Sequence, residues 1–212
     1  TMVTMLQAIS TTATVPIVRV PWLEPGVIMK TLDAGAYAVI CPMVNTREDA
    51  QKFIAWTNYA PKGTRSFGPV RALLYAGADY PSQANDTIVR FAMIETADGM
   101  ANLDAIAATP GLDGIYVGPA DLTLSLHQGR LPPGFDREEP EMIAALQTIV
   151  AACKTNGLRA ALHCGTPDYA ARAIGWGFDM TTVGGDVRFL AAAAGAAVAG
   201  FRKLTEGVTT KA

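Results

Sequence analysis

Residues 114–126 read GIYVGPADLTLSL, and this stretch shows the pattern from which we infer the fold. A short apolar run ends abruptly at residues 118–121, GPAD, where a carboxylate follows the last buried position. The stretch 90–100, RFAMIETADGM, has the same form and presents Glu95 after its apolar run. A carboxylate at the tip of a buried strand costs desolvation energy unless a cation, a proton or hydrogen-bond donors offset it. Two such tips indicate a shared chemical reason.

Apolar, β-branched runs of this kind recur along the chain, and longer segments of helical period lie between them. Because the runs are apolar throughout instead of alternating, they are typical of a parallel sheet that is buried on both faces. The alternation of strand and helix, repeated about six times, predicts an α/β fold and favours a barrel over an open sheet. The six expected strands are residues 16–20, 37–42, 88–95, 114–119, 159–164 and 180–185.

Several helices have recognisable ends. Thr46 with Asp49 three residues later predicts a capped start, and Thr166-Pro167 reads as an N-cap followed by a first helical residue. Two longer connections stand out. Residues 62–85 are long enough to hold an extra short helix, a subunit contact or a functional loop, and the Pro- and Gly-rich residues 127–140 follow a strand tip, where a lid or a plain surface loop is expected.

Composition indicates one domain over residues 1–212 and excludes several function classes. A formal net charge of −2 with interspersed charges gives no basic footprint, so no nucleic-acid partner is expected. The apolar run 189–201 is too short and too alanine-rich to span a bilayer, and we interpret it as a packed helix with no membrane partner. The three cysteines lack metal or disulfide spacing, which predicts buried thiols in a cytoplasmic protein.

The number of strands conflicts with a closed barrel. Such a barrel needs eight strands, whereas six are found and the chain opens directly with a helical pattern at residues 1–10. Two explanations stay open: an open six-stranded sheet, or an N-terminal segment with two strands that is absent from this chain.

Glu95 and Asp121 are the main candidates for chemistry. In parallel barrels the residues that follow the strands form the active face, and adjacent strands lie roughly 4.8 Å apart, so both carboxylates can reach one ion. Oxygen ligands with open positions suit Mg²⁺ or Mn²⁺, with Co²⁺ or Zn²⁺ as alternatives. The competing interpretation is that the two carboxylates cap helices or pair with arginine.

Arg19 adds a permanent cation at the end of an apolar strand, which suits an anion or a developing enolate, although a buried salt bridge would also explain it. Gly118 and Pro119 allow close backbone approach, and the amides of Ala120 and Asp121 are placed to bind a carboxylate. No lysine falls at a strand tip, which disfavours Schiff-base chemistry. Neither His127 nor His163 reads as a convincing general base.

These features together resemble the HpcH/HpaI family of metal-dependent pyruvate aldolases, typified by 4-hydroxy-2-oxoheptanedioate aldolase. The resemblance covers nearly the whole chain, and the pair IET and VGPADL at its spacing is its specific part. The segments that carry it are RVPWLEP (19–25), LDAGAYAVICPMVNTREDA (32–50), RSFGPVRA (65–72), MIETADGMANLDAIAATPGLDGIYVGPADL (93–122) and GFDMTTVGGDVRFLAAAA (177–194).

The resemblance implies a TIM-type (β/α)8 barrel of which strands 3–8 are present here, assembled as a homo-hexamer with the helix at 186–204 exchanged between subunits. It implies that Glu95 and Asp121 bind the metal that chelates pyruvate, and that the amides around Ala120 hold the pyruvate carboxylate. By the same resemblance Arg19 stabilises the enolate oxygen.

Two further roles come from the resemblance alone. Leu162 matches a position that shapes the aldehyde pocket, and Asp33 matches an aspartate that orients a catalytic histidine. The family places that histidine ahead of the helix that resembles residues 1–10, so we expect an incomplete chain.

The sequence therefore predicts a carbon–carbon lyase that reversibly cleaves 4-hydroxy-2-oxo acids to pyruvate and an aldehyde. A citrate-lyase-type or macrophomate-synthase-like lyase or decarboxylase shares the metal site and stays open as an alternative. An alternative of another class is a non-catalytic assembly subunit or fragment.

Overall fold

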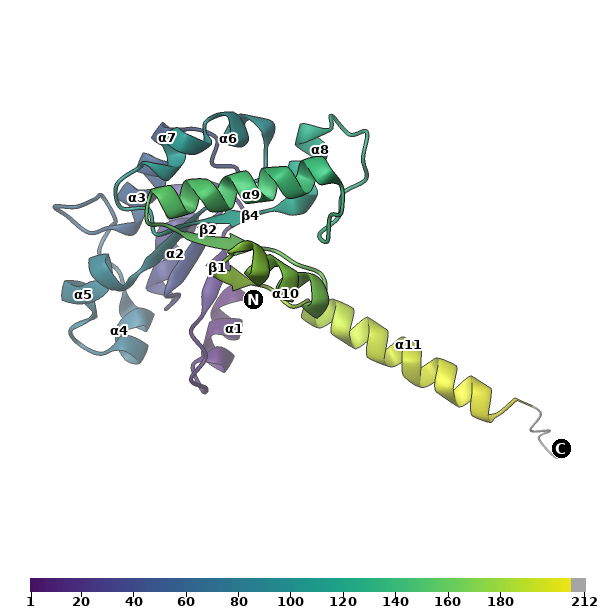
Figure 1. Cartoon of the computed structure of the whole chain (residues 1–212). Coiled ribbons are helices and arrows are strands. Elements are labelled where there is room, and N and C mark those ends of the chain that lie inside the picture. The colour runs from purple at the N-terminus through teal and green to yellow at the C-terminus, as the bar shows by residue number, and fades with distance from the viewer. Residues whose placement is uncertain (207–212) are drawn as a thin grey trace.

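A computed structural model describes residues 1–206 as a parallel sheet with helices packed against it (Figure 1). The strands are β1 (Ile17–Arg19), β2 (Ala38–Cys41), β3 (Val89–Ile94), β4 (Gly114–Val117), β5 (Arg159–Leu162) and β6 (Met180–Thr181). The helices are α1 (Met2–Ile9), α2 (Pro25–Asp33), α3 (Arg47–Thr57), α4 (Val70–Ala76), α5 (Tyr80–Thr87), α6 (Ala97–Ala101), α7 (Leu103–Ala107), α8 (Pro119–Leu126), α9 (Pro140–Thr155), α10 (Pro167–Trp176) and α11 (Asp186–Leu204).

All six expected strands form, and they pair in parallel in the order in which they occur in the chain, from β1 to β6. This order is that of consecutive strands in a (β/α)8 barrel, which confirms the predicted α/β fold class. Within residues 1–206 the sheet is open, because β1 and β6 are its edges and do not pair with each other. The edge strands are also the more exposed ones, whereas β2 and β4 are buried along their whole length.

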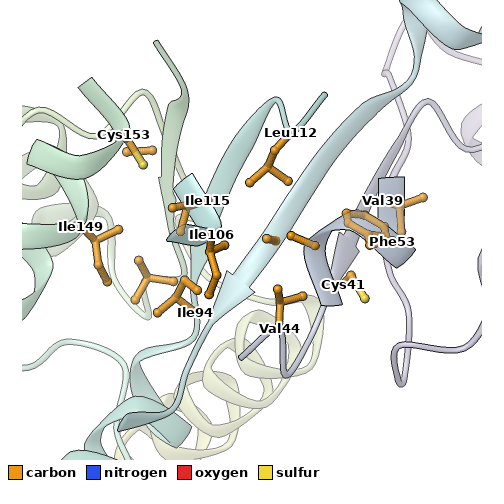
Figure 2. Packing of buried hydrophobic residues seen from close by; sticks show 14 of the residues in the cluster. Val39, Cys41, Val44, Phe53, Ile94, Ile106, Leu112, Ile115, Ile149 and Cys153 are labelled. Carbon is orange, nitrogen blue, oxygen red and sulfur yellow. The ribbon is translucent and has the colours of Figure 1, made fainter. Parts of the chain in front are cut away.

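Side chains alternate between the two faces of each strand, and this alternation divides the core in two. One face packs against the helices, as Val39, Ile94 and Ile115 do against helix residues such as Phe53 and Ile149 (Figure 2). The opposite face carries a smaller cluster, which lines the concave side of the sheet and consists of Ile40, Phe91, Met93, Tyr116 and Ala161, with Met180 packed against it.

The predicted helix starts are confirmed. The Thr46 hydroxyl accepts a hydrogen bond from the Asp49 amide at 3.1 Å, and the Asp49 carboxylate accepts in return from the Thr46 amide. Asp49 also accepts from the Asn45 amide at 3.2 Å, which ties the loop after β2 to α3. Thr166 caps α10 in the same way, with Pro167 as its first residue.

The long connection that begins at residue 62 holds two short helices, α4 and α5. An extra short helix was one of the three expectations for this segment. The three cysteines are free and buried. No helix within residues 1–206 is both long and apolar enough to cross a membrane.

The last helix, α11, is exposed along its whole length. Residues 189–201 form part of α11 as predicted, but no residue of α11 is buried, and Figure 1 shows the helix projecting away from the sheet. The surface against which this helix packs therefore lies outside residues 1–206 of one chain, if the helix is packed as predicted. Its exposed large apolar side chains need another surface to cover them, so the exchange of 186–204 between subunits stays a prediction. These side chains are Val187, Phe189, Leu190, Val198, Phe201 and Leu204.

The capping box of α3 provides a stability test. Replacing Thr46 by alanine removes the hydroxyl that satisfies an N-terminal amide, and we expect a loss of about 1 kcal/mol in the free energy of unfolding. Chemical denaturation measures this loss. Thr148→Ala, on the exposed face of α9, is the matched control and should change stability by less than about 0.5 kcal/mol. Equal effects of the two substitutions would contradict the role of the box.

Candidate active site

Register brings three residues to one level at the carboxyl end of the sheet. Ile94 is opposite Val117, and Val117 is opposite Leu162. The next residue of each strand is Glu95, Gly118 and His163, and all three fall on the concave face by alternation. A cavity of about 480 Å³ opens there, which is lined by Ile17, Arg19, Ile40, Met93, Tyr116, Gly118, Pro119, Ala120, Asp121, Phe135, His163, Met180, Thr181 and Thr182.

Glu95 is a carboxylate buried at the strand end, with 2% of its surface exposed. Its Oε1 accepts a hydrogen bond of 2.8 Å from the Met43 amide, whereas its Oε2 has no partner among the described residues. Burial raises the pKa of Glu95, the Met43 hydrogen bond opposes that shift, and the charge of nearby Asp121 adds to it. Met43 has a positive φ of 56°, which is uncommon for a residue with a side chain and orients its amide toward Glu95.

Gly118 is required by close approach at this point. A Cβ at position 118 would lie 2.7 Å from Glu95 Oε2 and 2.4 Å from Met93 Cε, both inside normal contact distance. Pro119 begins α8, so Asp121 falls in the first turn of that helix and lines the cavity. The chain thus places one buried and one exposed carboxylate beside the same cavity.

This pair fits a hard divalent ion. The unpartnered Glu95 oxygen is the atom that a cation would satisfy, and Asp121 can supply a second oxygen ligand. In the part of the chain that the structure describes, no group of three or more His, Cys, Asp or Glu residues is arranged to hold a metal. Mg²⁺ and Mn²⁺ are commonly held by one or two carboxylates with waters and substrate oxygens in the other positions, whereas structural zinc sites use four protein ligands.

Arg19 and the start of α8 complete the polar surroundings. Arg19 lines the cavity at the end of β1 and forms no ion pair with any residue in the range 1–206, so the salt-bridge alternative is not observed. The amides of Ala120 and Asp121 belong to a helical first turn without a side-chain cap. First-turn amides have no helical partner and are free to bind an anion.

Among the cavity residues that were not predicted, three are aromatic: Tyr116, Phe135 and His163. Tyr116 precedes Gly118 by two positions and lies on the same face, while His163 was considered only as a general base and set aside. Strict alternation, counted back from Gly118 and forward from Ala161, identifies both. Phe135 comes from the connection at 127–140, where Asp136 accepts hydrogen bonds from the Gly165 amide and the Thr166 hydroxyl, so the segment is tethered to the start of α10.

Leu162 does not line the cavity, and the role assigned to it stays a prediction. Its side chain has no exposed surface and belongs to the core between sheet and helices. The physical reason is the period of two along β5, which turns Leu162 away from the concave face and His163 toward it.

The predicted role of Asp33 in orienting a catalytic histidine stays a prediction, and the structure shows a different contact for this carboxylate. Helix α2 starts after the carboxyl end of β1 and runs back, so Asp33 at its end lies near the amino end of β2, on the side opposite to Glu95. There Asp33 pairs with Arg65 at 2.7 Å, and the Arg65 side chain is fully buried. Arg65 also donates to Tyr80 at 3.1 Å and lies over the Tyr59 ring. Asp33 therefore compensates a buried charge.

Residues 1–193 match the family described as HpcH/HpaI aldolase/citrate lyase. The chain is 42% identical over 200 residues to the hydroxypyruvate/pyruvate aldolase of Rhizorhabdus wittichii, an alignment that covers 94% of this chain and 78% of that protein. It is 36% identical over 190 residues to the 5-keto-4-deoxy-D-glucarate aldolase of Shigella dysenteriae serotype 1, with coverage of 88% and 72%.

The fold agrees with these similarities. The crystal structure of a family protein from Burkholderia cenocepacia J2315 superposes with a TM-score of 0.85 at 32% identity and covers 95% of this chain and 79% of that one. The chain belongs to the HpcH/HpaI aldolase/citrate lyase family. Its enzyme class is accordingly that of the aldolases, which are carbon–carbon lyases.

Removal of the Asp33 carboxylate should reduce stability and leave the site intact. Asp33→Asn leaves the buried Arg65 guanidinium without its counter-charge, and we expect a loss of roughly 2–3 kcal/mol in the free energy of unfolding. Denaturant unfolding measures this loss, and turnover per folded molecule at low temperature should be unchanged. A variant of normal stability with abolished turnover would favour the catalytic interpretation.

The metal site gives a separate prediction. Glu95→Gln and Asp121→Asn keep side-chain shape but remove the negative charge, so Mn²⁺ affinity should fall by at least about 100-fold, because even outer-shell changes at metal sites cost roughly 10–100-fold. Mn²⁺ electron paramagnetic resonance titration measures the affinity. Glu141→Gln on the exposed start of α9 is the control. Undiminished Mn²⁺ binding by both site variants would place the ion elsewhere.

Proposed function

We propose that this protein reversibly cleaves 4-hydroxy-2-oxo acids to pyruvate and an aldehyde, with Mg²⁺ or Mn²⁺ held by Glu95 and Asp121. The observation that carries the proposal is the unpartnered, buried Oε2 of Glu95 beside a cavity that also contains Asp121 and the unpaired Arg19. Membership in the aldolase family agrees with it. A bound divalent ion would supply the positive charge that acidifies the C3 protons of pyruvate and favours its enolate.

The residues of the chain have separate roles in this proposal. The free amides of Ala120 and Asp121 at the start of α8 bind the pyruvate carboxylate. Arg19 faces the negative charge that develops on the C2 oxygen, and its planar guanidinium can give that oxygen two N–H donors. Removal of the C3 proton needs a base, which by family resemblance is a histidine, and this assignment stays a prediction.

The cavity wall supports the same chemistry. Apart from its polar end, the cavity is lined by apolar side chains, including Ile40, Met93 and Met180. Such a wall limits water and strengthens the interactions of Arg19 with a developing charge. No lysine lines the cavity in the described part of the chain, so the proposed reaction uses no Schiff base.

The named relatives suggest which substrates to test. The R. wittichii relative is named for hydroxypyruvate and pyruvate, and the S. dysenteriae relative for 5-keto-4-deoxy-D-glucarate. All three are 2-oxo acids or their aldol adducts. We propose pyruvate as the 2-oxo acid of this protein, with hydroxypyruvate as the second to examine.

Exchange of the pyruvate C3 protons with deuterated solvent, followed by NMR, tests the proposal. The protein with Mg²⁺ should accelerate exchange above the Mg²⁺-only control, and EDTA should abolish the acceleration. Arg19→Lys should slow exchange by about 100-fold, because a point charge does not replace a planar pair of donors. No metal-dependent exchange would refute the proposal. Rapid decarboxylation of oxaloacetate, or cleavage of a coenzyme A thioester without pyruvate exchange, would instead favour the lyase alternative.

A further inference from the structure

Tyr116 and His163 form a hydrogen-bonded pair on the concave face that the proposed reaction has not yet used. Tyr116 lies on β4 two residues before Gly118, and His163 directly follows β5. The Tyr116 hydroxyl is 2.9 Å from His163 Nδ1, and both residues line the cavity. Tyr116 is 4% exposed, so its hydroxyl needs partners within the protein, and His163 is one of them.

The protonation states of the pair follow from its surroundings. Burial raises the pKa of Tyr116 to about 12, so this hydroxyl keeps its proton near neutral pH. Burial also lowers the pKa of His163, with the charges of Arg188 and Arg19 acting in the same direction and Asp136 opposing them. A neutral imidazole has one donor and one acceptor nitrogen. A tyrosine hydroxyl can donate or accept in such a contact; we assign the Tyr116 hydroxyl as the donor to Nδ1, which puts the ring N–H on Nε2.

The Nε2 atom is available to a ligand. It makes no hydrogen bond with the described residues and is not among their buried, unpartnered polar atoms, so it reaches the cavity. The ring is held from two sides, by Tyr116 at Nδ1 and by the Phe135 ring, which meets it edge to face with centroids 4.6 Å apart. A donor that is fixed before the substrate binds needs no reorganisation during the reaction.

The His163 donor lies apart from the Glu95 and Asp121 carboxylates. Glu95, Gly118 and His163 are level on three adjacent strands, so Glu95 and His163 are two strand spacings apart, or roughly 10 Å. A 2-oxo acid at Glu95 and Asp121 leaves the His163 side for the second substrate. The Thr182 hydroxyl nearby is already engaged, because it donates to the Cys164 carbonyl at 2.9 Å and accepts from the Cys164 amide at 2.7 Å.

We propose that His163, oriented by Tyr116, binds the aldehyde substrate by donating its Nε2–H to the carbonyl oxygen. The inference rests on the proposed aldolase function. In the addition direction, the enolate C3 forms a bond to the aldehyde carbon, the carbonyl π pair moves to oxygen, and that oxygen takes a proton from water. His163 keeps its own proton and stabilises the negative charge on oxygen by the hydrogen bond. Tyr116 is a positioning residue.

Two measurements distinguish a role in aldehyde binding from a role in pyruvate binding: addition of pyruvate to an aldehyde, and exchange of the pyruvate C3 protons without aldehyde. His163→Phe removes the donor, and we expect kcat/KM for addition of pyruvate to glycolaldehyde to fall by about 100-fold, as for loss of one oxyanion donor. Pyruvate C3 exchange without aldehyde should stay within about twofold, because its groups lie on the other side of the cavity. His163→Gln keeps an N–H donor and should recover part of the addition rate.

Tyr116→Phe frees the imidazole to exchange its ring proton between the two nitrogens. We expect a smaller fall in the addition rate and a rise in the pKa seen in its pH profile, since Nδ1 can then bind a proton without losing the tyrosine. An unchanged profile would contradict the positioning role.

The outcomes are distinguishable. Normal addition by His163→Phe would overturn the inference and leave the aldolase proposal standing. Loss of pyruvate exchange together with addition would also overturn it, because His163 would then serve the pyruvate end or the fold. Absence of metal-dependent exchange in the unaltered protein would refute the aldolase proposal itself, and the inference with it.

Discussion

The structure depends on keeping the Glu95 carboxylate buried at the end of a strand. A carboxylate without compensation is costly in that position, and one backbone amide, from Met43, satisfies only one of its two oxygens. Two unusual local features accompany it: the positive φ of Met43, and a glycine at position 118 where a Cβ would collide with the carboxylate. Both lie against the carboxylate, whose second oxygen has no partner among residues 1–206.

The parallel sheet brings residues that are far apart in the sequence together at one site. Because β3, β4 and β5 pair in register, the residues that follow them meet at one level, and alternation sends Glu95 and His163 to the same face. The helix that follows β4 then brings Asp121 and free amides to that level. The cavity therefore has polar groups on two of its sides and apolar side chains between them.

Much of this organisation could be predicted from the sequence. The apolar runs identified all six strands because strands buried on both faces carry a strong composition signal, and the Glu95 and Asp121 carboxylates stood out because they break those runs. The assignments of Leu162 and Asp33 have a different basis, the family resemblance, and they stay predictions. A motif match does not say where a side chain lies. The face to which Leu162 points depends on its position in the alternation along β5. The end of the sheet at which Asp33 lies depends on the direction in which α2 runs. His163 was missed because a lone histidine carries no such pattern, and only its contact with Tyr116 defines its state.

The conformation of Met43 has a consequence for how the protein can change. A non-glycine residue with positive φ costs of order 1–3 kcal/mol, and an unneutralised buried carboxylate adds to that cost. Met43 and Glu95 are hydrogen-bonded to each other, so both costs arise at one place. In the ion-free protein the proposed metal site is therefore a source of instability. Selection for heat resistance alone would therefore favour substitutions that relax the Met43 turn or neutralise Glu95. Gains in robustness obtained that way would come at the expense of turnover.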